Sequence, residues 1–317
     1  MKAACNDIEF MECFKKHGSP QAVALELGVH VRNVHARRRT IENKYNISLA
    51  SWRDERTVSG KVVVPANRHR LEASLSDGVV IVFSDAHYWP GEPTTAHLAL
   101  VEVCKQLKPK MVVANGDVYD GARISRHEPM YTGTMQLPTA NQELDAVRLR
   151  MSEIEKVSKG AHRFWTIGNH DSRLHRYIVV NAPELSDMPG VSLWDYFNGW
   201  EHGWSLMVNG DVMIKHRYHN GIHAAYNNAL KAGTSIVTGH LHRLVVTPWG
   251  DYRGRRYGVD TGTLSDPDGD QYTYLEGNPT PWCSGFAVLT FENGRLLPPE
   301  LCEVIDGHAY FRGQRVL

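Results

Sequence analysis

Several features that would assign this chain to a specialised class of protein are missing from its sequence. No apolar run approaches the roughly 20 residues that a membrane-spanning helix needs. The first ten residues carry acidic side chains where a secretory signal peptide has its apolar stretch. The five cysteines form no CxxC pair and no disulfide framework, which fits a reducing compartment. We therefore expect a cytoplasmic protein with no membrane partner.

Net charge is also missing, because 35 lysines and arginines balance 35 aspartates and glutamates. A neutral chain has no long-range field that draws it to nucleic acid or to an anionic surface. Any such binding would have to come from a local basic patch. At 317 residues the chain is long for one core, so we expect a sizeable domain and a smaller one.

The first sixty residues predict a small all-α module. Apolar side chains at helical spacing indicate helices over residues 7–16, 20–27 and 29–45. Ser19 followed by Pro20 is typical of the start of a helix. Two short helices followed by a longer one are similar to a helix-turn-helix module, whose third helix enters the major groove of DNA.

Arginines on the third predicted helix are candidates for DNA contact. They are Arg32, Arg37, Arg38 and Arg39. Residues 1–60 hold ten basic and seven acidic side chains, so their net charge is only +3. The alternative is that these arginines form a solvated helix face and that the module docks on the larger domain or on a partner protein.

From Gly78 onward, strand-like segments alternate with helical ones, as in a layered α/β fold. The continuous apolar run over 79–83 predicts a buried strand, and 111–114 and 162–167 predict a second buried strand and a third strand. Each run leads into a loop of carboxylate, amide or imidazole side chains. Because the carboxyl ends of parallel strands meet at one edge of a sheet, three such loops predict an active-site rim.

Two further histidine motifs follow. Asn209-Gly210 predicts a hairpin whose returning strand leads to His216. A short apolar run then ends in Gly239-His240-Leu241-His242. Residues two apart in an extended backbone point the same way, so this spacing suits metal ligands. In a chain with 17 histidines such a pair also arises by chance.

Three strands predicted after this motif, over 243–247, 255–259 and 285–291, indicate a second sheet packed on the first. Two long segments could modify a site at the sheet edge. Residues 125–139 are long enough to form a cover or specificity loop. Aromatic side chains within 175–204 could stack on a base or pack in the core.

The five motifs, taken in order, resemble those of the calcineurin-like metallophosphoesterase superfamily. They are D-x-H at Asp85 and His87, G-D-x-x-D at 116–120, G-N-H-D at 168–171, the lone His216, and G-H-x-H at 239–242. The resemblance spans about 78–243. It implies an α/β fold, a four-layer α/β/β/α sandwich of two mixed sheets, over 77–317. Residues 1–60 are then an appended small N-terminal all-α helical module and 61–76 a linker.

The resemblance also implies a centre of two divalent transition-metal ions. Asp85, His87 and His242 would hold one ion. Asn169, His216 and His240 would hold the other, and Asp117 would bridge both. Carboxylate, amide and imidazole ligands suit Mn²⁺, our first expectation, and also Fe, Zn²⁺ or Ni²⁺. We expect Gly239 to allow the tight turn that lets His240 and His242 serve different ions.

Further roles follow from the same resemblance. His170 would be a general acid or charge donor at the leaving group, with Asp120 behind it. Arg123 and Arg173 are candidates to bind the phosphate, although each has the alternative of an ordinary surface arginine. His219 could line the substrate cleft.

The motifs depart from those of the phosphoprotein phosphatases, which have G-N-H-E and an arginine directly after the second aspartate. They are closer to the nuclease and phosphodiesterase branches. We therefore expect a hydroxide activated by the two metals to hydrolyse phosphodiesters of nucleic acid or nucleotides. The alternatives are a small-molecule phosphomonoesterase, a cyclic-nucleotide phosphodiesterase, and a DNA-binding regulator that uses the fold as a scaffold. The combination with a helical module is similar to phosphoesterases carried by bacteriophages, which implies the cytoplasm of a bacterial cell or phage-infected host.

Overall fold

The computed structural model describes residues 5–17, 19–45, 47, 49, 69–125 and 137–317. The chain divides into two compact units, residues 1–68 and 69–317, and each is described by itself. In the described part of the chain, no helix combines the length and the apolar character that crossing a membrane requires.

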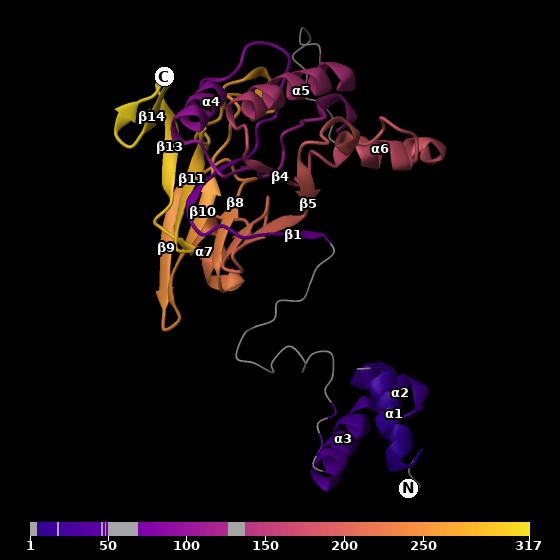
Figure 1. Cartoon of the computed structure of the whole chain (residues 1–317). Helices are drawn as coiled ribbons and strands as arrows, with labels where there is room; N and C mark the ends of the chain where they lie inside the picture. Colours follow the sequence, from indigo (N-terminus) through magenta and orange to yellow (C-terminus); the bar gives the residue numbers. More distant parts are fainter. Residues whose placement is uncertain (1–4, 18, 46, 48, 50–68, 126–136) are drawn as a thin grey trace. The chain divides into compact units, whose positions relative to one another are not determined.

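The N-terminal unit contains the three predicted helices. They are α1 (Asp7–His17), α2 (Pro20–Glu26) and α3 (Val31–Tyr45) (Figure 1). Phe10 and Phe14 from α1, Val23 from α2, and Val34 and Ile41 from α3 are buried together as its core. The predicted helical module is confirmed.

The larger unit is built on two mixed sheets. The six-stranded sheet has, in spatial order, β1 (Arg70–Ala73), β6 (Ser205–Val208), β7 (Val212–Ile214), β8 (Ser235–Thr238), β10 (Gly254–Thr261) and β9 (Leu244–Asp251). The nine-stranded sheet has β15 (Gln314–Arg315), β14 (His308–Phe311), β13 (Glu300–Ile305), β11 (Gly285–Glu292), β2 (Gly78–Phe83), β3 (Met111–Ala114), β4 (His162–Thr166) and β5 (Glu201–Gly203), with β12 (Arg295–Leu296) paired to β11.

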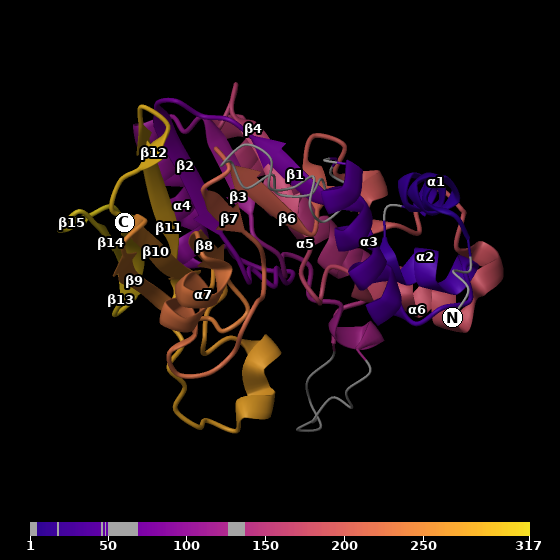
Figure 2. The same cartoon turned by 90° about the horizontal axis from the view of Figure 1, so that it is seen from below.

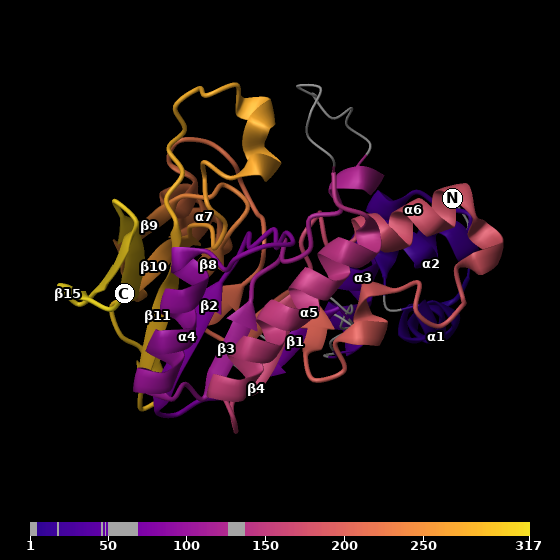
Figure 3. The same cartoon turned by 90° about the horizontal axis from the view of Figure 1, so that it is seen from above.

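Helices form the two outer layers. The long helices α4 (Thr95–Leu107) and α5 (Ala140–Val157) lie on the outer face of the nine-stranded sheet, as Figure 3 shows. Helix α7 (Ala224–Ala232) packs on the six-stranded sheet. The predicted four-layer sandwich is confirmed. The remaining helical segments are α6 (Arg173–Asn181), η2 (Ala122–Ile124), η3 (Pro183–Leu185), η4 (Leu193–Tyr196) and η5 (Asp270–Leu275).

Alternation along the central strands divides the apolar side chains between two cores. In β2, Val80 and Val82 face the six-stranded sheet, where they pack with residues such as Ile214. Ile81 and Phe83 face the helices. A strand buried on both faces must be apolar at every position, which explains the continuous runs in the sequence.

Strand direction brings the functional loops together. β2, β3 and β4 are parallel neighbours in one sheet, so the loops that follow them emerge at one edge. β7 and β8 are parallel neighbours in the other sheet, so His216 and Gly239 also emerge side by side. Residues far apart in sequence therefore converge at one place.

Two predictions about the organisation of the chain differ from the structure. β11 does not join β9 and β10: it pairs with β2 in the middle of the other sheet. The stretch predicted as a linker, 61–76, contains strand β1, which pairs in parallel with β6. The start of this stretch, 61–68, lies outside the described residues, as do 126–136 of the proposed cover loop.

Candidate metal centre

Backbone hydrogen bonds hold the motif loops in register with one another. The amide of Asp85 donates to the carbonyl of Gly116 at 2.9 Å. The amide of His87 donates to the carbonyl of Asp117 at 3.1 Å, and that of Gly239 to the carbonyl of His216 at 2.8 Å. The loops of both sheets are thus tied to their neighbours at the atoms next to the predicted ligands.

The predicted ligands form two groups. Ligand atoms of Asp85, His87 and His242 lie within 4.8 Å of one another, and so do those of Asp117, His216 and His240. All of these side chains are buried except that of His240, which is half-buried. The two groups match the predicted division of the GHLH histidines between two sites.

Unpartnered polar atoms provide a test of whether a metal fits here. Buried polar atoms normally have hydrogen-bond partners. Four such atoms on the predicted ligands have no hydrogen-bond partner: Asp85 Oδ1, His87 Nε2, Asn169 Oδ1 and His216 Nε2. His242 points its Nε2 at Asp85 Oδ1, 3.2 Å away, and its buried Nδ1 also has no partner. This donor set of carboxylate, amide and imidazole fits divalent transition-metal ions.

The other ring nitrogens of two histidines are already occupied. His216 Nδ1 lies 2.8 Å from the carbonyl of Asn115, to which it can only donate. His87 Nδ1 lies 3.1 Å from Asp120 Oδ1. A proton held at Nδ1 leaves the lone pair of Nε2 for a metal, so these acceptors fix the tautomer that ligation requires.

Five of the predicted ligands have a positive φ. The angles are 52° for Asp85, 40° for His87, 52° for Asp117, 74° for His240 and 57° for His242. Side chains with a Cβ rarely adopt this region, and each instance costs about 1–2 kcal/mol. Such strain, concentrated on one group of side chains, is typical of a functional site.

These angles correct our expectation for Gly239. Its φ is not among the positive ones, so the turn is made by the histidines themselves. A Cβ at Gly239 would lie 2.6 Å from Asp85 Oδ2. The glycine is needed because the Asp85 carboxylate packs against its backbone and accepts the amide of His240 at 2.8 Å.

The charged groups of the site shift one another's pKa values. Burial would raise the pKa of Asp85, but His216 and His242 outweigh burial and hold that pKa at about 2. Burial would lower the pKa of His216, but Asp117 and Asp85 raise it to about 10. The two carboxylates therefore stay ionised and require positive charge beside them.

The predicted catalytic pair is in contact. His170 Nδ1 lies 2.8 Å from Asp120 Oδ1, and the His170 side chain is 20% exposed. Burial would raise the pKa of Asp120, but hydrogen bonds from His170 and His87 hold it well below its ordinary value. Asp120 therefore stays ionised and orients both rings.

The three predicted substrate-binding residues differ in whether they contact the catalytic pair. Arg173 reaches the catalytic pair: it donates to the carbonyl of Asp120 at 2.8 Å and lies 3.0 Å from His170 Nε2. Arg123 is exposed and donates instead to the carbonyl of Leu137 at 2.6 Å. The ring of His219 packs on Tyr218. In the part of the chain that the structure describes, neither Arg123 nor His219 has a hydrogen bond or ion pair with the ligand groups.

The sequence did not reveal the role of Asp171. Its buried carboxylate accepts the amides of Asp117 (3.0 Å), Val118 (3.0 Å), Tyr119 (3.3 Å) and Gly168 (2.8 Å), and the indole N–H of Trp165 (3.0 Å). This one side chain fixes the Asp117 loop against the Gly168 loop. Its place directly after His170 was a usable signal.

Two more supporting residues were missed. The indole N–H of Trp89 donates to Asp120 Oδ2 at 3.2 Å. Glu143 accepts the amides of Gly121 (2.5 Å) and Ala122 (3.0 Å), directly after Asp120. Burial and the neighbouring Asp120 raise the pKa of Glu143 to about 8. Nothing in the spacing of these residues connects them with the motifs.

The four predicted DNA-contacting arginines differ in their surroundings. The guanidinium group of Arg37 lies 5.1 Å from the ring centre of Phe10, and Arg38 lies 5.2 Å from that of Phe14. Arg38 also pairs with Glu42 at 2.9 Å. Arg32 and Arg39 are exposed. Half of the predicted basic surface is therefore used to stabilise the module.

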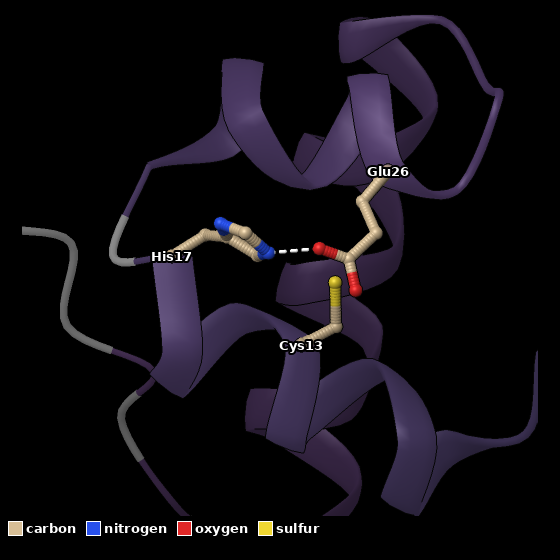
Figure 4. Close-up of side chains that lie close together, drawn as sticks. All are labelled: Cys13, His17 and Glu26. Carbon is tan, nitrogen blue, oxygen red and sulfur yellow. Dashed lines mark hydrogen bonds and ion pairs between the residues drawn. The ribbon is translucent and has the colours of Figure 1, made fainter.

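A second group of metal-type side chains lies within the N-terminal unit. Cys13 and His17 of α1 face Glu26 of α2, as Figure 4 shows. Glu26 pairs with His17 and also with Lys16, whose ammonium lies 3.3 Å from its carboxylate. Because Lys16 already supplies the positive charge, we interpret this group as the ion pair that joins α1 to α2.

Known proteins with a similar sequence or structure were found by comparison. The family model of calcineurin-like phosphoesterases matches residues 78–257. The Gene 54 proteins of Mycobacterium phages L5 and D29 are 26% and 29% identical to this chain, and each match covers 72% of this chain and 94% of the phage protein. The structure of Vacuolar Protein Sorting 29 from Cryptosporidium parvum aligns with a TM-score of 0.42 and 12% identity over 74% of this chain and 96% of that one.

The contacts of Asp171 lead to a prediction. In Asp171→Asn one carboxylate oxygen becomes an NH₂ group, which faces N–H donors instead of accepting from them. We expect the affinity for divalent metal to fall about 10- to 100-fold, as for other residues that orient ligands. Calorimetric titration with Mn²⁺ measures this. The exposed Asp187→Asn is the control, and equal affinity in both variants would show that Asp171 does not position the ligands.

Proposed function

The chain belongs to the calcineurin-like phosphoesterase family, and we propose that it hydrolyses phosphodiester bonds in nucleic acid or nucleotides at a centre of two divalent transition-metal ions. The observation that supports this most is the set of buried, unpartnered ligand atoms in two adjoining groups. When bound, two such ions activate a water for in-line attack and offset the charge of the phosphate.

In this proposal Asp85, His87 and His242 hold one ion. Asn169, His216 and His240 hold the other. Asp117 would contribute negative charge to the centre, which would reduce the repulsion between two dications. His216 Nε2 lies 3.0 Å from Asp117 Oδ2 without a hydrogen bond, as expected for two ligands that point at one ion.

His170 acts on the leaving group. Asp120 lies 2.8 Å from Nδ1 and orients the ring so that Nε2 faces Arg173. A phosphate oxygen beside Nε2 would receive hydrogen bonds from both side chains. With its imidazole protonated at both nitrogens, His170 would give the Nε2 proton to the departing oxygen as the P–O bond breaks, and Arg173 would stabilise the developing negative charge.

A diester substrate is favoured over a monoester by two observations. The G-N-H-D motif and the absence of an arginine directly after Asp120 distinguish the site from protein phosphatases. The exposed Arg32 and Arg39 give the N-terminal module a means of contacting DNA phosphates.

A regulator that used the fold only as a scaffold would have no need of a complete ligand set.

Paired variants separate the metal ligand from the catalytic histidine. Asp117→Asn weakens the charge between the ions, so we expect metal content and hydrolysis of bis-p-nitrophenyl phosphate to fall together. His170→Ala leaves the ligands intact, so we expect full metal content and about 10²- to 10⁴-fold slower turnover. Metal analysis and initial rates measure both. The enzyme proposal fails if Asp117→Asn is as active as the native chain.

The DNA contact is tested by the two exposed arginines. Replacing Arg32 and Arg39 by alanine removes two phosphate contacts, so we expect weaker binding to duplex DNA and a salt slope smaller by about 2. Fluorescence anisotropy at several salt concentrations measures this. Arg253→Ala with Arg315→Ala, exposed positions of the larger unit, is the control. If both double variants bind equally, the module does not contact DNA through these residues.

A further inference from the structure

Aromatic side chains gather beside the candidate metal centre, and they do not come from the segment that the sequence suggested. In 175–204, Trp194 packs on Trp165 and His202, and Trp200 is buried in the core. The aromatic side chains beside the site are instead Trp89, Tyr272, Tyr274 and Trp282, which we call the aromatic rim.

The rim contacts the ligand histidines directly. The ring centres of Trp282 and His242 are 4.4 Å apart, and those of Tyr272 and His87 are 6.0 Å apart. Tyr272 and Trp282 lie edge-to-face with their centres 4.9 Å apart, a favourable geometry for aromatic rings. The rim thus begins at the ligands themselves.

Part of the rim is anchored and part is accessible. Tyr272 is buried, and its hydroxyl bonds to Ser265 at 2.6 Å. Trp282 and Trp89 are half-buried, and Tyr274 is 50% exposed. The segment that carries η5, drawn in gold, projects from the body of the fold in Figures 2 and 3. The accessible rings of Tyr274 and Trp282 both contact the buried ring of Tyr272, which fixes their positions.

A cavity of about 510 Å³ opens beside the rim. Tyr272 and Trp282 of the rim line it, together with polar residues such as Asp268 and Asn278. The cavity thus combines flat apolar faces with a few polar groups. This composition suits a planar ring that carries polar edges.

The rim lies on the side of His170. Trp89 donates to Asp120, the partner of His170. The ring centre of Tyr272 lies 6.0 Å from that of His87, which in turn lies 4.6 Å from that of His170. In the proposed mechanism His170 faces the departing oxygen, so the rim faces the group attached to that oxygen.

We propose that the aromatic rim binds the base of the nucleoside on the leaving-group side of the scissile phosphodiester. This inference rests on the proposed function and narrows its substrate class to diesters whose leaving group carries a nucleobase. Stacking on Trp282 and Tyr274 would hold the base beside the metals. Because every base has a π face, such a subsite selects for a base without distinguishing strongly among the four.

Three matched substrates test the proposal: the dinucleotide TpT, and the same compound with an abasic residue at its 3′ end or at its 5′ end. The nucleoside that TpT releases identifies the leaving group, and the substrate that is abasic at that end is the one compared with TpT. Each has one phosphodiester bond, and product formation is followed by chromatography in the presence of Mn²⁺. We expect the native chain to prefer TpT by about tenfold in kcat/KM, with the difference mainly in KM, as one stacked base implies. In Trp282→Ala and in Tyr274→Ala the ratio of the two kcat/KM values should fall toward one. Trp282→Phe should retain most of the native ratio.

Tyr252→Ala is the matched control, because Tyr252 is a fully exposed tyrosine between β9 and β10. Metal analysis of each variant separates stacking from an effect on His242, and Tyr274→Ala removes no contact with a ligand. Equal kcat/KM for both substrates in the native chain, or an unchanged preference in Trp282→Ala and Tyr274→Ala, would contradict the proposal that the rim binds a base. Neither result would contradict the proposed phosphodiesterase activity. No hydrolysis of any diester, bis-p-nitrophenyl phosphate included, would overturn the rim and the proposed function together.

Discussion

Two carboxylates, Asp85 and Asp117, lie fully buried at the ends of neighbouring parallel strands. Buried ionised groups are tolerated only when opposite charge and hydrogen bonds compensate for lost solvation. The imidazoles around them provide part of that compensation, and a bound cation would add to it. Most other features of the larger unit follow from the need to hold these two charges together.

The sandwich architecture meets this need through the direction of its strands. Parallel β2 and β3 bring the two aspartates to one edge, and parallel β7 and β8 bring the histidines from the other sheet. Five of the candidate ligands have a positive φ, which carries a local cost. Asp171 and Asp120 then fix the loops and the rings through hydrogen bonds. Strain at the ligands is thus offset by the surrounding packing.

A residue's role could be predicted from the sequence when it depends on neighbours along the chain. It could not be predicted when it depends on contacts with residues far away in the sequence. The apolar strands and the ligand motifs were readable because both follow from neighbours along the chain. The position of β11 was not, since antiparallel pairing with β2 depends on a distant partner. Gly239 was assigned the wrong reason: close approach of Asp85, a residue 154 positions earlier, cannot be seen in the motif itself. Trp89, Glu143 and the aromatic rim are invisible for the same reason.

The central claim is that the two ligand groups hold two ions bridged by Asp117. Anomalous diffraction from crystals of the full chain grown with Mn²⁺ tests it most directly. We predict two anomalous peaks about 3.5–4 Å apart, one beside Asp85, His87 and His242 and the other beside Asn169, His216 and His240. A single peak, or peaks remote from Asp117, would contradict this account.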